Sequence, residues 1–189
     1  MWLPISASIY KDKGRIFSKM INIKKFYSDI KDIKYGWHTK NGQLHEKLTE
    51  GNFAKDYKMQ SVKNIEKTNH AICWEMCELQ RKYFKKRKIK HKTIFAVLKK
   101  HRKLPCHTFT VFNYNNKWYW FEASWQNQKG IHEYNSLSEI LDYFRNNFED
   151  FAKGEYDKSN MEFYSYLKPP FRFNCNLFYF WCLHSRKLK

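Results

Sequence analysis

Hydrophobic and polar positions in the N-terminal third of the chain predict two helices. Apolar residues recur every three or four positions over residues 19–33, directly after Ser18, whose hydroxyl can cap a helix. Ser61 can cap a second, shorter helix over residues 62–68. Residues 1–17 show no such period, and we expect them to form an irregular extension.

Helical periodicity returns at Cys73 and continues to about Lys88. The helical positions i, i+3, i+4, i+7 and i+11 are occupied by Cys73, Met76, Cys77, Gln80 and Phe84. Cys73 therefore falls in the first turn, where unpaired N–H groups and the helix dipole stabilise a thiolate. A further amphipathic helix is predicted over Ser136–Phe148, with Ser136 as its cap and Glu139 three residues later.

Three stretches with the hydrophobicity of β-strands lie between these two helices. They are Thr93–Lys100, Cys106–Tyr114 and Lys117–Trp125. Asn115 and Asn116 separate the last two, and because asparagine tolerates positive φ they predict a two-residue hairpin turn. We expect the aromatic stretch 171–184 to add one or two strands. Helices packed on an antiparallel sheet give an α+β fold.

The predicted turn fixes which side chains share a face of the hairpin. A two-residue turn places Phe109 opposite Glu122, so that His107 and Glu122 become diagonal neighbours on one face, about 7–8 Å apart. A shift of one residue would put them on opposite faces. The same face carries three apolar residues that we expect to pack against the helix starting at Cys73, namely Val111, Trp118 and Trp120.

Length and composition favour one packed domain. With 189 residues, 42% of them hydrophobic, we divide the chain into an N-terminal extension and helix, residues 1–34, and a single domain, residues 35–189. No stretch approaches about 18 consecutive apolar residues, so we expect no membrane span. The apolar part of the N-terminus is too short for a signal peptide, and we expect a cytoplasmic protein.

A net charge of +18 has two possible explanations. It can indicate an anionic partner such as nucleic acid, for which the best candidate surface is the basic run Lys82–Lys103. It can also reflect composition alone, because lysine, asparagine and isoleucine are abundant in proteins with AT-rich coding sequences. Specific recognition of phosphates and bases favours arginine over lysine.

Cys73, His107 and Glu122 follow one another in the order nucleophile, base and acid. Considered singly, Cys73 could be a small buried apolar residue and His107 a structural histidine. Glu122 stands between apolar residues of a buried strand, where a carboxylate requires a partner. A rival interpretation is a metal site formed by Cys73, Cys77 and His107. The five cysteines are irregularly spaced and odd in number, so no disulfide framework and no structural zinc are predicted.

Three blocks of the sequence, AICWEMCELQRKYF, PCHTFTVFNYNNKWYWFEASWQNQKGIHEY and SLSEILDYF, resemble the small bacterial proteins of the transglutaminase-like superfamily. The resemblance covers residues 35–148 and implies a papain-like fold. It implies that Cys73 is the nucleophile, His107 the base and Glu122 the orienting acid of amide chemistry on a protein or peptide. Peptide hydrolysis, deamidation and acyl transfer all occur in the superfamily, and no cofactor or metal is implied.

Further residues have two interpretations each. Gln60 precedes the nucleophile, as an oxyanion-hole glutamine does in papain-like enzymes, or it is a surface glutamine. Trp74 and Trp125 either wall a cleft or pack in the core. For the whole chain, the alternative to an enzyme is an inactive transglutaminase-like binding module with a basic surface for nucleic acid or another anionic partner.

Overall fold

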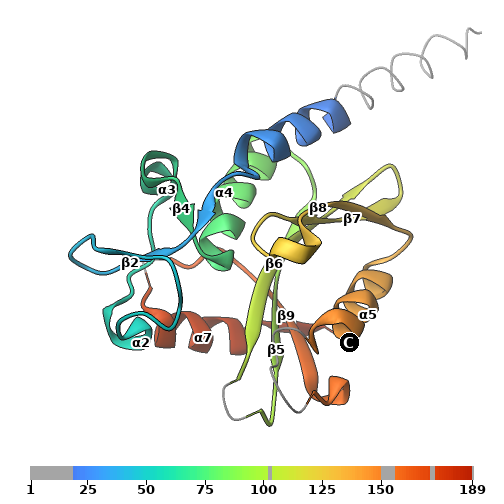
Figure 1. The fold of residues 1–189 in the computed structure, drawn as a ribbon. Coiled ribbons are helices and arrows are strands. Elements are labelled where there is room, and N and C mark those ends of the chain that lie inside the picture. The colour runs from blue at the N-terminus through green and yellow to red at the C-terminus, as the bar shows by residue number, and fades with distance from the viewer. Residues whose placement is uncertain (1–18, 102–103, 150–155, 171–172, 189) are drawn as a thin grey trace, which may run out of the picture. The chain divides into compact units, whose positions relative to one another are not determined.

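The computed structural model describes residues 19–101, 104–149, 156–170 and 173–188 (Figure 1). The chain divides into two compact units, Met1–Asp32 and Ile33–Lys189. In the first unit, residues 19–30 form a helix. The predicted cap Ser18 and the predicted extension over residues 1–17 lie outside the described residues.

A six-stranded, fully antiparallel sheet is the centre of the second unit, and the chain is therefore α+β. Its strand order is β10-β9-β5-β6-β7-β8. The strands are β5 (His91–Leu98), β6 (Cys106–Tyr114), β7 (Lys117–Glu122), β8 (Gly130–Tyr134), β9 (Met161–Tyr166) and β10 (Arg186–Leu188). The sequence predicted β5, β6 and β7, and the other three strands were not predicted.

Among the described residues of this unit, two small sheets and five helices surround the large sheet. The strand β1 (Lys34–Tyr35) pairs in parallel with β4 (His70–Ala71), and β2 (Trp37–His38) pairs in antiparallel with β3 (Leu44–His45). The helices are α2 (Phe53–Asp56), α3 (Val62–Thr68), α4 (Cys73–Lys86), α5 (Leu137–Asn147) and α7 (Cys175–Leu183). Among the described residues, no helix is long and apolar enough to cross a membrane.

The helix α5 covers one face of the large sheet, and α4 and α7 lie on the other side (Figure 1). The α5 face holds a core cluster that includes Val111, Trp120 and Phe144. The prediction that these residues pack against the helix of Cys73 is therefore wrong. Val111 and Trp120 pack against α5, and Trp118 lies at the margin of the same cluster. Strand alternation determines which residues share a face, but it does not determine which helix covers that face.

The helix α4 packs on the opposite face through other residues. The ring of Phe84 contacts Phe112 and Phe121, with centroids 5.1 and 5.6 Å away. The thiol of Cys77 lies against Thr108 and Thr110 of β6. The β6 residues in these contacts alternate along the strand with the residues that face α5.

The hairpin register agrees with the prediction. Asn115 and Asn116 form the two-residue turn, with φ of 50° and 59°, and Tyr114 pairs with Lys117. Two consecutive residues with positive φ match the twist of a hairpin, and asparagine accepts this conformation at low cost. The predicted helix caps are also present, since the Ser61 and Ser136 hydroxyls accept backbone N–H bonds of 3.2 and 3.1 Å.

The aromatic C-terminal stretch was predicted to be strands and is instead the helix α7. The Asn174 side chain caps it by accepting from the Leu177 N–H at 2.9 Å. Phe178 and Cys182, four residues apart, are buried in the core cluster on the α4 side of the sheet. A short apolar run has no clear period, so aromatic content alone favoured strands, while packing on an existing sheet selected the helix.

Candidate active site

The first residue of α4 is Cys73, which exposes 9% of its surface. The preceding N-cap residue, Ile72, makes no side-chain hydrogen bond to the helix. The N–H groups of the first turn are therefore not occupied by a cap, and they remain near the thiol. Such groups favour a negative charge, on a thiolate or on an oxygen bound beside it.

Glu75 anchors this end of α4 from inside the protein. Its carboxylate is fully buried and accepts from the Tyr57 hydroxyl at 2.9 Å, the Gln60 N–H at 2.7 Å and the Ile72 N–H at 3.2 Å. Burial raises the pKa of Glu75 to about 7, although these hydrogen bonds oppose the shift. The start of the helix is thus tied to the segment before α3.

His107 and Glu122 meet as the hairpin register predicted. His107 Nε2 lies 2.8 Å from Glu122 Oε2, and both side chains are almost completely buried. Burial lowers the pKa of His107, but the negative charge of Glu122 and hydrogen bonds with Cys73 and Glu122 outweigh it and raise the pKa. The imidazole is therefore held in its charged form.

The second carboxylate oxygen of Glu122 is bound by the chain that follows it. The Ser124 N–H, the Ser124 hydroxyl and the Trp125 N–H donate to Oε1 at 2.8, 3.0 and 2.9 Å. Burial raises the pKa of Glu122, but His107 and these donors lower it below its ordinary value. The strand β7 ends at Glu122, three residues before the predicted end, and the N–H groups of Ser124 and Trp125 bond to the carboxylate.

The thiol of Cys73 completes the arrangement. The β6–β7 ladder ends at Thr110 and Phe121, so His107 lies on a part of β6 without a β7 partner. Here the His107 side chain is hydrogen-bonded to Cys73 of α4. Because Nε2 faces Glu122, Nδ1 is the ring nitrogen left for the thiol. Burial raises the pKa of Cys73, but the hydrogen bond to His107 and its charge, with Thr108, lower it below the ordinary value.

Cys175 provides a comparison within the same molecule. It is the first residue of α7, as Cys73 is of α4. Burial and the nearby charge of Cys73 raise the pKa of Cys175 to about 11. The two thiols share a helix-initial position, and the contact with the His107 imidazole accounts for the opposite shift at Cys73.

The structure places Gln60 differently from both predictions. It is 7% exposed, so it is not a surface glutamine. Its amide donates to the His70 carbonyl at 3.1 Å and to Glu75 at 3.4 Å, and its oxygen accepts from the Thr68 hydroxyl at 3.2 Å. Gln60 therefore braces the start of α4 and has no free donor for an oxyanion.

Trp74 and Trp125 are core residues, 3% and 4% exposed. Trp74 packs on Phe178 and donates to the Tyr57 hydroxyl at 2.5 Å. Trp125 has a second role, because its ring lies 5.8 Å from that of His107. It therefore shields the imidazole on the α5 side.

Tyr35 is a site residue that the sequence did not indicate. In the β1–β4 pair it lies opposite Ala71, two residues before Cys73. Although 38% of Tyr35 is exposed, burial of its hydroxyl and the charges of Cys73, Cys106 and Glu75 raise its pKa well above the ordinary value. The Tyr35 hydroxyl therefore stays neutral and lies within electrostatic range of the Cys73 thiol. The parallel pairing joins distant segments, so no local pattern could reveal it.

The side chains of the rival metal site are not placed together as ligands. Among the described residues, no group of three or more His, Cys, Asp or Glu is placed to hold a metal ion. Cys77, one ligand of the rival metal site, lies instead against β6 and Tyr166 of β9.

Comparison of the chain with protein-family models, curated proteins and solved structures gave no match. The transglutaminase-like family therefore stays a prediction from the sequence blocks.

The rate at which Cys73 reacts with iodoacetamide should rise with pH and reach its plateau before pH 9, the ordinary thiol pKa, because His107 stabilises the thiolate. Cys175 in the same sample should still gain reactivity toward pH 11. Quantitative mass spectrometry of both alkylated peptides measures this. His107→Ala should remove the plateau of Cys73 only. Parallel pH profiles for the two cysteines would contradict an activated thiol.

Glu75 should make the protein less stable as pH rises from about 4.5 to 7. In that window the folded state keeps a proton that the unfolded state has lost, because the folded pKa is raised. The change is on the order of 3 kcal/mol. Urea unfolding of the wild type and of Glu75→Gln, which cannot titrate, isolates this dependence. Equal pH slopes for the two proteins would refute it.

Proposed function

We propose that this chain catalyses cysteine-dependent amide chemistry through a thioester acyl-enzyme, within a papain-like, transglutaminase-like fold. One observation carries the proposal, the continuous buried contact from Glu122 through His107 to Cys73 at the start of a helix. The order of residues and the sequence blocks support the same assignment. Peptide hydrolysis, deamidation and acyl transfer share this first step.

In the proposed mechanism, the Cys73 thiolate attacks the carbonyl carbon of an amide while His107 carries the proton taken from the thiol. Glu122 keeps the imidazole oriented and stabilises its positive charge. The carbonyl oxygen becomes an oxyanion, which the Cys73 backbone N–H and the Tyr35 hydroxyl would bind. His107 then gives its proton to the leaving nitrogen, the carbon–nitrogen bond breaks, and a thioester remains on Cys73.

The thioester is then resolved by a second nucleophile. Water, deprotonated by His107, would release a carboxylic acid and restore the thiol. An amine would instead form a new amide, which makes the outcome acyl transfer. The nucleophile that reaches the thioester thus decides between hydrolase and transferase.

A binding module without catalysis is the second candidate. The observation that favours it is a cationic groove on α4, separate from Cys73. This alternative requires no activated thiol, whereas the enzyme requires one.

The activated ester p-nitrophenyl acetate should release p-nitrophenolate in a burst and leave an acetyl group on Cys73. Absorbance and peptide mass mapping measure the two products. Cys73→Ala should abolish the burst, and His107→Ala should slow it by about 100-fold or more. Cys175→Ser is the matched control, since it removes the other helix-initial thiol. Acetyl groups spread evenly over the cysteines would refute the proposal.

Tyr35→Phe should slow acylation by p-nitrophenyl acetate by roughly 100-fold, because one oxyanion donor is lost. Alkylation by iodoacetamide forms no oxyanion, so its rate and pH profile should stay nearly unchanged. If both reactions slow equally, Tyr35 acts by shaping the site and not as a donor.

A further inference from the structure

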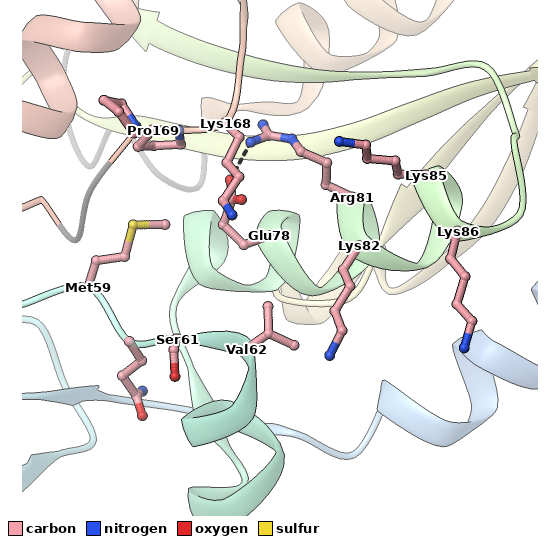
Figure 2. Close-up of a pocket in the computed structure, with 12 residues that line it drawn as sticks. Met59, Ser61, Val62, Glu78, Arg81, Lys82, Lys85, Lys86, Lys168 and Pro169 are labelled. Carbon is pink, nitrogen blue, oxygen red and sulfur yellow. Dashed lines mark hydrogen bonds and ion pairs between the residues drawn. The ribbon is translucent and has the colours of Figure 1, made fainter.

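A groove with a volume of about 820 Å³ runs along a face of α4 that the catalytic proposal does not use (Figure 2). Its α4 residues differ from Cys77 and Phe84, which face the sheet. On α4 the lining includes Arg81, Lys82, Lys85 and Lys86. The other walls come from the segment before α3 and the segment after β9. The volume is in the range of about 300–1,000 Å³ found for ligand sites.

The groove has an excess of positive charge. Arg81 is already paired, with Glu78 at 2.5 Å. Lys82 lies 3.5 Å from Glu66, an exposed ion pair that contributes little. Lys85, Lys86 and Lys168 form no ion pair with any residue that the structure describes, and all three are exposed. Lys85 and Lys86 are therefore available to an anionic ligand, while the charge of Lys168 already acts on the Glu78 carboxylate.

Part of the groove lining is apolar. It consists of Met59, Val62, Pro169 and Pro170, of which Val62 and Pro170 are accessible and the other two are buried. Figure 2 shows Val62 below α4, Met59 and Pro169 to its left, and Lys82 and Lys86 extending separately from the helix. The cations therefore do not converge on one point, as they would around a single phosphate. An elongated ligand with several charges and an apolar edge fits this arrangement.

We propose that this groove binds an acidic polypeptide segment of a partner protein, with its carboxylates on the α4 lysines and its apolar side chains against Val62 and Pro170. Nucleic acid is less suited, because the described residues of the lining include no aromatic ring to stack on bases, and the single arginine among them is already paired. The apolar wall also has no counterpart in a sugar–phosphate backbone. Charge complementarity would set the rate and specificity of association.

The proposed docking is independent of the proposed chemistry at Cys73. The groove draws on the C-terminal half of α4, whereas Cys73 is its first residue. Cys73→Ala should therefore bind the partner segment as the wild type does. Loss of acylation and loss of docking are separate outcomes.

Fluorescence anisotropy with a fluorescein-labelled peptide of four Glu-Glu-Leu repeats tests the groove on the full chain. The double variant Lys85→Glu/Lys86→Glu should raise the Kd about tenfold or more, since two attractions become repulsions. Lys40→Glu/Lys90→Glu, with the same change in net charge on exposed lysines outside the groove, should stay within about twofold. Circular dichroism checks folding, and Lys85→Gln/Lys86→Gln replaces the first variant if it unfolds.

Two further probes separate an acidic peptide from any polyanion. A peptide of four Glu-Glu-Ser repeats should bind several-fold more weakly, because it lacks apolar contacts. An oligothymidylate with the same number of charges should compete poorly. The proposal is overturned if the Glu-Glu-Leu peptide does not bind, if the oligonucleotide competes equally, or if both double variants lose binding equally.

Discussion

The buried contact between His107 and Glu122 is the constraint on which the rest of the site depends. Neither charge would be tolerated alone at this depth, and removing one partner of such a pair costs about 3–5 kcal/mol. The contact joins the start of β6 to the end of β7 at 2.8 Å. It also fixes the imidazole ring, so that its second nitrogen can serve Cys73.

The bonds around Glu122 connect this pair to the local fold. One carboxylate oxygen faces His107, and the other collects the N–H groups of Ser124 and Trp125. Because these N–H groups bond to the carboxylate, they do not extend β7 beyond Glu122. The edge of β6 beside His107 therefore stays open. The short sequence after Glu122 thus serves two purposes, satisfying a buried charge and leaving room for a thiol from another layer.

Local patterns in the sequence predicted the parts of the fold that are determined locally. The Asn115–Asn116 turn gave the register, and the register brought His107 and Glu122 together. The helical period also placed the start of α4 at Cys73. These features depend on neighbours within a few residues.

Contacts between distant segments could not be predicted in this way. Tyr35 reaches the site through a two-residue parallel pairing, and Gln60 is buried by its bonds to residues around α4. The helix α7 was mistaken for strands because its aromatic residues have no visible period, and its packing on the sheet decided the outcome. The covering of the Val111 face by α5 is a similar case, since strand alternation says nothing about the helix opposite.

The two-residue turn has a consequence for how related chains should be recognised. His107 and Glu122 are 15 residues apart, and most of these positions lie in the two strands that lead to and from the turn. A residue gained or lost within either strand would turn His107 or Glu122 to the wrong face. A longer turn would leave both faces unchanged, because three-residue loops also close hairpins. In a related chain, the distance from each of the two residues to its own end of the turn should therefore be more restricted than the length of the turn.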